Sequence, residues 1–178
     1  MYDYRAELLH VKPPAPRGIR NNNPGNLEAG SNWQGLANAS EYTPDQQAET
    51  RFAVFQHPKY GIRALVKILQ TYHSKYRLDT IHAIMSRYAP SSENNTIAYA
   101  LAVAKHVDTG INDPIDLRNQ TVIRRMVEAI ISHENGMQPY PDNVIMDGIA
   151  LAGMTVTGDP FNPPVAVQPP QANREPDQ

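Results

Sequence analysis

The chain has 178 residues, which is long enough for one domain with a buried core. Its 16 Lys and Arg residues nearly balance its 18 Asp and Glu residues, and the formal net charge of -2 excludes a strong overall attraction to nucleic acid or to anionic membranes. It contains no cysteine, which excludes disulfides, thiolate zinc sites and cysteine hydrolase mechanisms.

The composition divides the chain into three parts. Residues 1–16 end in "KPPAP" and predict an extended N-terminal arm, because proline fixes φ and restricts the residue before it. Residues 17–154 carry the patterns of a folded domain, and the Pro-rich residues 155–178 predict an extended tail. The start lacks the order of a signal peptide and no apolar run reaches ~18 residues, so we expect no membrane span.

The domain begins with the turn-rich segment "RGIRNNNPGNLEAG", in which Asn, Gly and Pro favour tight turns. The stretches "SNWQGLA" and "TRFAVFQH" then predict two short strands. We expect them to form a small β-hairpin with a long loop over residues 38–50.

Helical periodicity begins at residue 59 and predicts four helices. They cover residues 59–76, then 78–90 with Asp79 as N-cap and Pro90 as stop, then 96–107, and finally 119–133, directly before Glu134. The stretch "VIMDGIALAGM" fits either a short helix or a covering strand. The expected fold class is therefore mainly α, with α+β character from the hairpin.

Glu134 lies where the fourth helix should present an apolar side chain. At about 3.6 residues per turn it falls near the middle of an apolar stripe. That stripe consists of Ile123, Met126, Val127, Ile130 and Ile131. Removal from water disfavours a charged carboxyl, and a neutral carboxylic acid can protonate a glycosidic oxygen. The alternative is a helix-terminal glutamate that reaches solvent or pairs with Arg124 or Arg125.

The segment "RGIRNNNPGNL" offers many amide donors and acceptors in a rigid loop. Such a loop suits the N-acetyl and hydroxyl groups of sugars and can hold an adjacent carboxyl, although it also fits a turn-rich connector. Trp33, the only tryptophan, is a candidate for stacking on a sugar ring, whereas Phe52 and Phe55 fit the hairpin core.

Other chemistries find little support in the sequence. The six histidines are scattered, and "HEN" is not the H-E-x-x-H of a zinc helix. The chain has no G-x-S-x-G elbow and no P-loop, and "DTGINDPID" fits helix capping better than a calcium loop. We therefore predict no metal site and no cofactor.

The blocks "RGIRNNNPGNL", "NWQG", "FAVFQHPKYGIRAL", "RYAPSSENNTIAYA" and "HENG" together resemble the peptidoglycan-degrading structural proteins of tailed bacteriophage virions, in the lysozyme-like superfamily. The resemblance covers roughly residues 17–136. It implies a lysozyme-like helical domain and cleavage of the MurNAc–GlcNAc backbone by hydrolysis or by lytic transglycosylation. "HENG" resembles the "E-S-G" end of the helix that carries the catalytic acid in such enzymes.

Two features depart from that pattern. The helix ending in "HENG" follows the Asn-rich segment, whereas in many relatives it precedes it, which indicates a circularly permuted arrangement. Glu28 also stands where relatives often carry a basic residue, so it is a candidate second carboxyl. Because transglycosylases can use one acid and the N-acetyl group of the substrate, we favour a mechanism with one glutamate.

The resemblance assigns Glu134 as the general acid and base. The residues expected to position the sugar or Glu134 are Arg20, Asn22, Asn23 and Asn26, and those expected to contact the sugar in the cleft are Trp33, Gln34 and Tyr60. We expect the protein in the virion, made in the host cytoplasm and acting on host peptidoglycan during entry. The arm and the tail would then bind other virion proteins. The alternatives are a non-catalytic structural subunit of a tail or capsid and a free endolysin.

Overall fold

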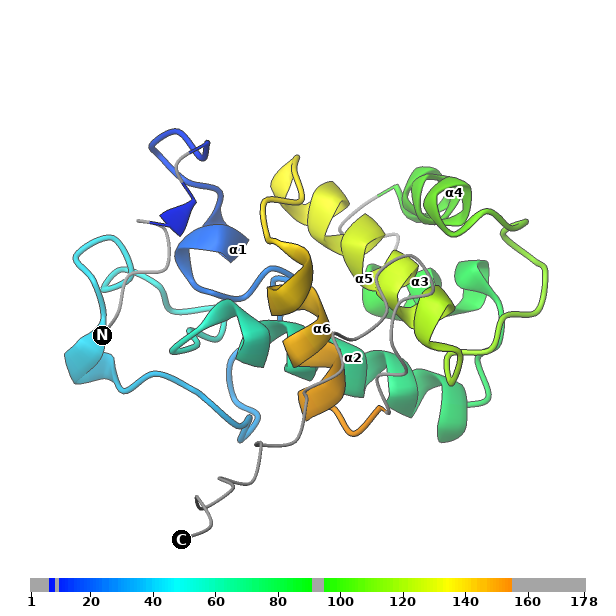
Figure 1. Ribbon diagram of the computed structural model, residues 1–178, viewed down its shortest axis with the longest axis horizontal. Helices are drawn as coiled ribbons and strands as arrows, with labels where there is room; N and C mark the ends of the chain where they lie inside the picture. Colours follow the sequence, from blue (N-terminus) through cyan, green and yellow to red (C-terminus); the bar gives the residue numbers. More distant parts are fainter. Residues whose placement is uncertain (1–6, 9, 91–94, 155–178) are drawn as a thin grey trace, which may run out of the picture.

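The structure, a computed structural model, describes residues 7–8, 10–90 and 95–154, and this part of the chain is mainly helical, as the sequence predicts (Figure 1). The α-helices are α1 (Arg17–Arg20), α2 (Pro58–Ser74), α3 (Ile81–Tyr88), α4 (Thr96–Val107), α5 (Gln120–Asn135) and α6 (Asp142–Leu151), and Ala39–Glu41 forms the 3-10 helix η2. The tail predicted over residues 155–178 lies outside the described residues.

The helices begin and end at residues suited to these positions. The side chain of Asn119 caps α5 by accepting hydrogen bonds from the backbone N–H groups of Thr121 and Val122. Gly136 ends α5 in the left-handed conformation, at φ +69°, where a glycine has no Cβ to clash. The prediction of Asp79 as an N-cap was wrong, because Thr80 accepts the capping bond instead.

The predicted hairpin is not formed as a regular pair of strands. In the described residues the second predicted strand makes only isolated antiparallel bridges, one from Phe55 to Leu36 of the first predicted strand and one from Phe52 to Glu28, which lies before that strand. The N–H groups of residues 53 and 55 donate to the Asn-rich segment, whereas the carbonyl of Val54 and the N–H of Gln56 bond to residues 37 and 35 of the first predicted strand. This change of partner prevents a continuous ladder. The stretch "VIMDGIALAGM", which fits a short helix or a strand by sequence, lies mostly in the helix α6.

The helices pack into one principal core. α6 packs across α2, and α4 packs against both α3 and α5 (Figure 1). Leu65 of α2 and Ile130 of α5 are fully buried in this core, and Leu8 of the N-terminal arm is buried with them. A smaller apolar cluster, which includes Leu27 and Phe55 of the loops, lies against Ala64 of α2. None of the described helices is long and apolar enough to cross a bilayer.

The N-cap of α2 predicts a dependence of stability on pH. The imidazole Nδ1 of His57 accepts a hydrogen bond from the Lys59 N–H at 3.2 Å, which only an unprotonated nitrogen can do. Burial lowers the pKa of His57 below its usual 6.5 and the Lys59 charge lowers it further, while Glu7 and Asp147 oppose the shift. The stabilising contribution is therefore present above about pH 6.5 and is lost as the pH falls.

We expect His57→Asn, which retains a capping acceptor but does not titrate, to remove this dependence. Urea unfolding at about pH 8 and pH 5 should show a loss of about 1 kcal/mol more for the wild type than for the variant. Equal losses in both proteins would contradict the assignment.

Candidate functional site

The last turn of α5 presents three consecutive polar side chains: His133, Glu134 and Asn135. Asn135 is 7% exposed, and its Nδ2 donates to the carbonyls of Pro24 at 2.8 Å and Ile131 at 2.9 Å. The first of these bonds fastens the end of α5 to the Asn-rich segment. It brings Asn26 of that segment next to Glu134.

Glu134 is half-buried, with a hydrogen bond to each carboxyl oxygen. Oε2 accepts from Nδ2 of Asn26 at 2.9 Å, and Oε1 accepts from the Tyr99 hydroxyl at 2.8 Å. The buried stripe of α5 continues from Ile131 to Asn135, so Glu134 lies at its edge rather than at its middle. Its surroundings are therefore partly polar.

Tyr99 connects Glu134 to the helices around it. Its ring stacks on His133 with centroids 3.6 Å apart and meets the ring of Tyr88 edge to face at 6.4 Å. Burial raises the pKa of Tyr99, and the neighbouring Tyr88 and Glu134 raise it further. Burial likewise raises the pKa of Tyr88 well above its usual value. Both phenols are therefore neutral donors, Tyr99 to Glu134 and Tyr88 to the Gly25 carbonyl.

A cavity of about 880 Å³ opens beside Glu134. Its wall is formed by the end of the Asn-rich segment, the loop that follows it, and parts of α2, α3 and α5. The polar and aromatic residues on that wall are Asn26, Glu28, Ser31, Trp33, Arg51, Phe52, Tyr72, Arg87, Tyr88 and Glu134. A cavity of this size, lined by aromatic rings and by charged and polar groups, is large enough for a small ligand.

The structure brings four of the residues selected from the sequence to this cavity. Glu134 and Asn26 are bonded to each other, and Glu28 and Trp33 line the same space. The Glu28 carboxylate is 68% exposed and forms an ion pair with Arg51 at 3.0 Å. The second carboxyl is thus within the cavity but is engaged with a cation.

The other selected residues do not line this cavity: Arg20, Asn22, Asn23, Gln34 and Tyr60. Asn23 is fully buried; its Nδ2 donates to the carbonyls of Leu27 and Ala53, both at 2.9 Å, and its Oδ1 accepts from the Leu27 N–H. Asn22, in a left-handed conformation, donates to the Phe55 carbonyl. These amides hold the loops that form the cavity wall.

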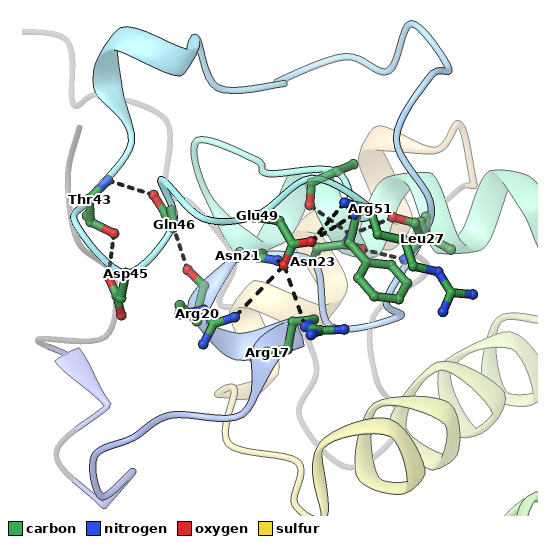
Figure 2. Close-up of polar contacts among 12 residues, drawn as sticks. Arg17, Arg20, Asn21, Asn23, Leu27, Thr43, Asp45, Gln46, Glu49 and Arg51 are labelled. Atoms are coloured by element: carbon green, nitrogen blue, oxygen red, sulfur yellow. Dashed lines mark hydrogen bonds and ion pairs between the residues drawn. The ribbon is translucent and has the colours of Figure 1, made fainter.

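A buried carboxylate that the sequence did not single out organises the same loops. Glu49 is 5% exposed and accepts a hydrogen bond from Asn21 at 2.9 Å, and Figure 2 shows it facing Arg17 and Arg20. Burial raises its pKa, but the hydrogen bond from Asn21, two backbone N–H bonds and the Arg17 charge together lower it below the usual value. Arg20 therefore supports the loop through Glu49.

Sequence reasoning also missed Tyr99, Tyr88 and Arg87. The available signal for Tyr99 was a bulky phenol among the small residues of "TIAYALAVAKHV", on the face that packs against neighbouring helices. Its partner, Glu134, is 35 residues away, so periodicity could not reveal the pair. Across the described part of the chain, no group of three or more His, Cys, Asp or Glu side chains could hold a metal ion.

The chain is similar to a bacteriophage protein. Protein P5 of Pseudoalteromonas phage PM2 is 39% identical over 138 residues, which cover 75% of this chain and 80% of the relative. No family model matches the chain.

The buried amide of Asn23 should be essential to the fold of the site. Asn23→Ala would leave the Ala53 carbonyl and the Leu27 N–H without these partners, while the Leu27 carbonyl keeps its bond from the Ala53 N–H, so we expect a loss of about 3 kcal/mol in the free energy of unfolding. Asn32→Ala, at an exposed position in the same region, is the control and should change stability by less than about 0.5 kcal/mol. Similar values for the two variants in chemical denaturation would contradict this role.

Proposed function

We propose, since this chain belongs to the family of Protein P5 of Pseudoalteromonas phage PM2, that it is a virion component that cleaves the MurNAc–GlcNAc backbone of peptidoglycan. The relationship confirms the predicted location in a bacteriophage virion. The observation that carries the proposed activity is Glu134, which lies on the wall of the 880 Å³ cavity with both oxygens fixed.

The arrangement around Glu134 suits a general acid. Tyr99 and Asn26 approach different oxygens and fix the plane of the carboxyl, while the cavity side stays open to a sugar. Fixing a catalytic group before the substrate arrives removes part of the entropic cost of reaching the transition state. Because burial raises the pKa of Tyr99, that phenol orients Glu134 and does not replace it as the acid.

The amide of Asn26 can support either protonation state of Glu134. The Oδ1 atoms of Asn26 and Asn135 are buried, with no hydrogen-bond partner among the described residues. They lie 3.1 Å and 2.4 Å from the position that a Cβ on Gly18 would take. Rotating the Asn26 amide by half a turn would exchange its two ends, so that Oδ1 instead of Nδ2 faces Glu134 Oε2 and can accept the proton of the neutral acid.

One glutamate is sufficient for a lytic transglycosylase, in which the N-acetyl group of the substrate replaces a second carboxyl. Glu28 is the candidate second carboxyl for a hydrolase, but its ion pair with Arg51 must then be broken or bypassed by the substrate. We therefore favour the mechanism with one glutamate. The lysozyme-like fold, in a circularly permuted form, is part of this proposal.

The test is digestion of purified peptidoglycan, with the products identified by mass spectrometry. We expect anhydro-muropeptides from the wild type and a fall in kcat/KM of about 10³-fold for Glu134→Gln, since a general acid contributes about 10²–10⁴-fold. Glu28→Gln is the matched control on the same cavity and should retain activity within about tenfold.

Equal activity of the wild type and Glu134→Gln would overturn the assignment of Glu134. Reducing-end sugars, lost in both glutamate variants, would indicate a hydrolase with two carboxyls. Absence of cleavage by a folded wild type, tried on several peptidoglycan types, would overturn the enzymatic proposal.

A second candidate function is a non-catalytic structural subunit of the particle, and the family relationship favours it. In this alternative the arm and the Pro-rich tail bind other virion proteins. Leu8 of the arm is 3% exposed and packs into the domain core, which leaves the tail as the segment to test.

We expect deletion of residues 157–178 to stop incorporation into particles while the purified domain keeps its thermal stability. Quantitative immunoblotting of purified virions measures the incorporation, and Glu134→Gln is the control that should still assemble. Normal incorporation of the truncated chain would contradict a docking role for the tail.

A further inference from the structure

A second charged group lies on the cavity wall, separate from Glu134. Arg87 is in the last turn of α3 and lines the cavity together with Tyr72 of α2. Its guanidinium carbon lies 3.8 Å from the ring centroid of Tyr76 and 5.3 Å from that of Tyr72. The two rings meet edge to face, 6.4 Å apart, and form a platform under the cation.

The two cations on the cavity wall differ in their partners. Arg51 is bonded to the Glu28 carboxylate at 3.0 Å, which offsets its charge. Within the described residues Arg87 has no carboxylate partner, and its recorded contacts are with the Tyr72 and Tyr76 side chains. The cavity therefore presents a cation that its own wall does not neutralise.

The platform determines how Arg87 can bind a ligand. A guanidinium stacked on an aromatic ring uses its face for the ring and keeps the N–H donors at its edge for another partner. Two of those donors match the two oxygens of a carboxylate in a bidentate pair. The aromatic contacts also restrict the side chain before binding, so less entropy is lost when an anion arrives.

We propose that Arg87, held by Tyr72 and Tyr76, binds a carboxylate carried by the muramyl unit of the glycan. The inference rests on the proposed peptidoglycan substrate. It adds that the cavity recognises this substrate by its carboxylate. The alternating sugar rings of the backbone are neutral, and the carboxylates belong to the lactyl group or to the peptide attached to it. Arg87 therefore selects muramyl-containing glycans over neutral N-acetylglucosamine polymers.

Binding can be measured without catalysis, because Trp33 is the only tryptophan and lines the cavity. In a Glu134→Gln background, its fluorescence would be titrated with three soluble glycans. Peptide-bearing strands carry peptide carboxylates, amidase-treated strands carry the free lactyl carboxylate, and chitooligosaccharides carry none. Comparing the peptide-bearing with the amidase-treated strands shows whether Arg87 binds a peptide carboxylate or the lactyl carboxylate.

We expect Arg87→Gln to weaken binding of at least one carboxylate-bearing strand by about tenfold and to leave binding of the chitooligosaccharide unchanged. Arg87→Lys should recover only part of the affinity, because an ammonium lacks the bidentate edge. Arg77→Gln, at an exposed arginine outside the cavity lining, is the matched control and should bind all three glycans like its parent.

Equal weakening for the charged and neutral glycans, or no weakening in a variant with unchanged thermal stability, would overturn the role of Arg87. Selective weakening in a chain whose wild-type form does not cleave peptidoglycan would support the carboxylate subsite and overturn the enzymatic activity alone. Cleavage by the wild type with unaltered binding by Arg87→Gln would overturn the subsite alone.

Discussion

The site depends on the hydrogen-bonded junction between the Asn-rich segment and the end of α5. Asn135 donates to the Pro24 carbonyl, and next to it Asn26 donates to Glu134, although the segment and the helix end are more than 100 residues apart. The approach is close enough that a Cβ on Gly18 would lie 2.4 Å from the Asn135 amide oxygen. These bonds fix the orientation of Glu134 relative to the Asn-rich segment. The end of α5 and that segment must therefore move together.

Buried asparagine amides pair with backbone groups of the loops, as neighbouring strands do in a β-sheet. Asn22 and Asn23 reach the carbonyls of Phe55 and Ala53, so side chains satisfy the backbone groups that strands would otherwise pair. Glu49 adds a charged acceptor at the other end of the same loops. A segment held in this way can bend around the cavity, and it becomes costly to alter because a lost amide leaves buried backbone groups without these partners.

Elements set by local periodicity could be predicted from the sequence. Features set by contacts between distant segments could not. The 3.6-residue repeat located α2, α4 and α5 closely, and "NG" marked the end of α5. The hairpin prediction failed because the segment around Phe55 pairs by single bridges with both Glu28 and Leu36 instead of along one partner strand. For the site, the stripe on α5 drew attention to Glu134, but the bond from Tyr99 joins two helices whose packing no single-sequence pattern encodes.

The polar contacts of Glu134 bear on whether the cavity is catalytic or a remnant of one. Asn135 alone already fastens α5 to the Asn-rich segment, so the junction does not require a carboxyl at the neighbouring position. A half-buried acid with two fixed donors brings a desolvation cost that an apolar side chain of similar size would avoid. An apolar side chain would leave the Tyr99 hydroxyl and the Asn26 amide without these partners, and the orientation that the two donors fix is also what a general acid needs. The geometry of Glu134 is therefore compatible with the proposed catalysis and with a role in joining α4, α5 and the Asn-rich segment.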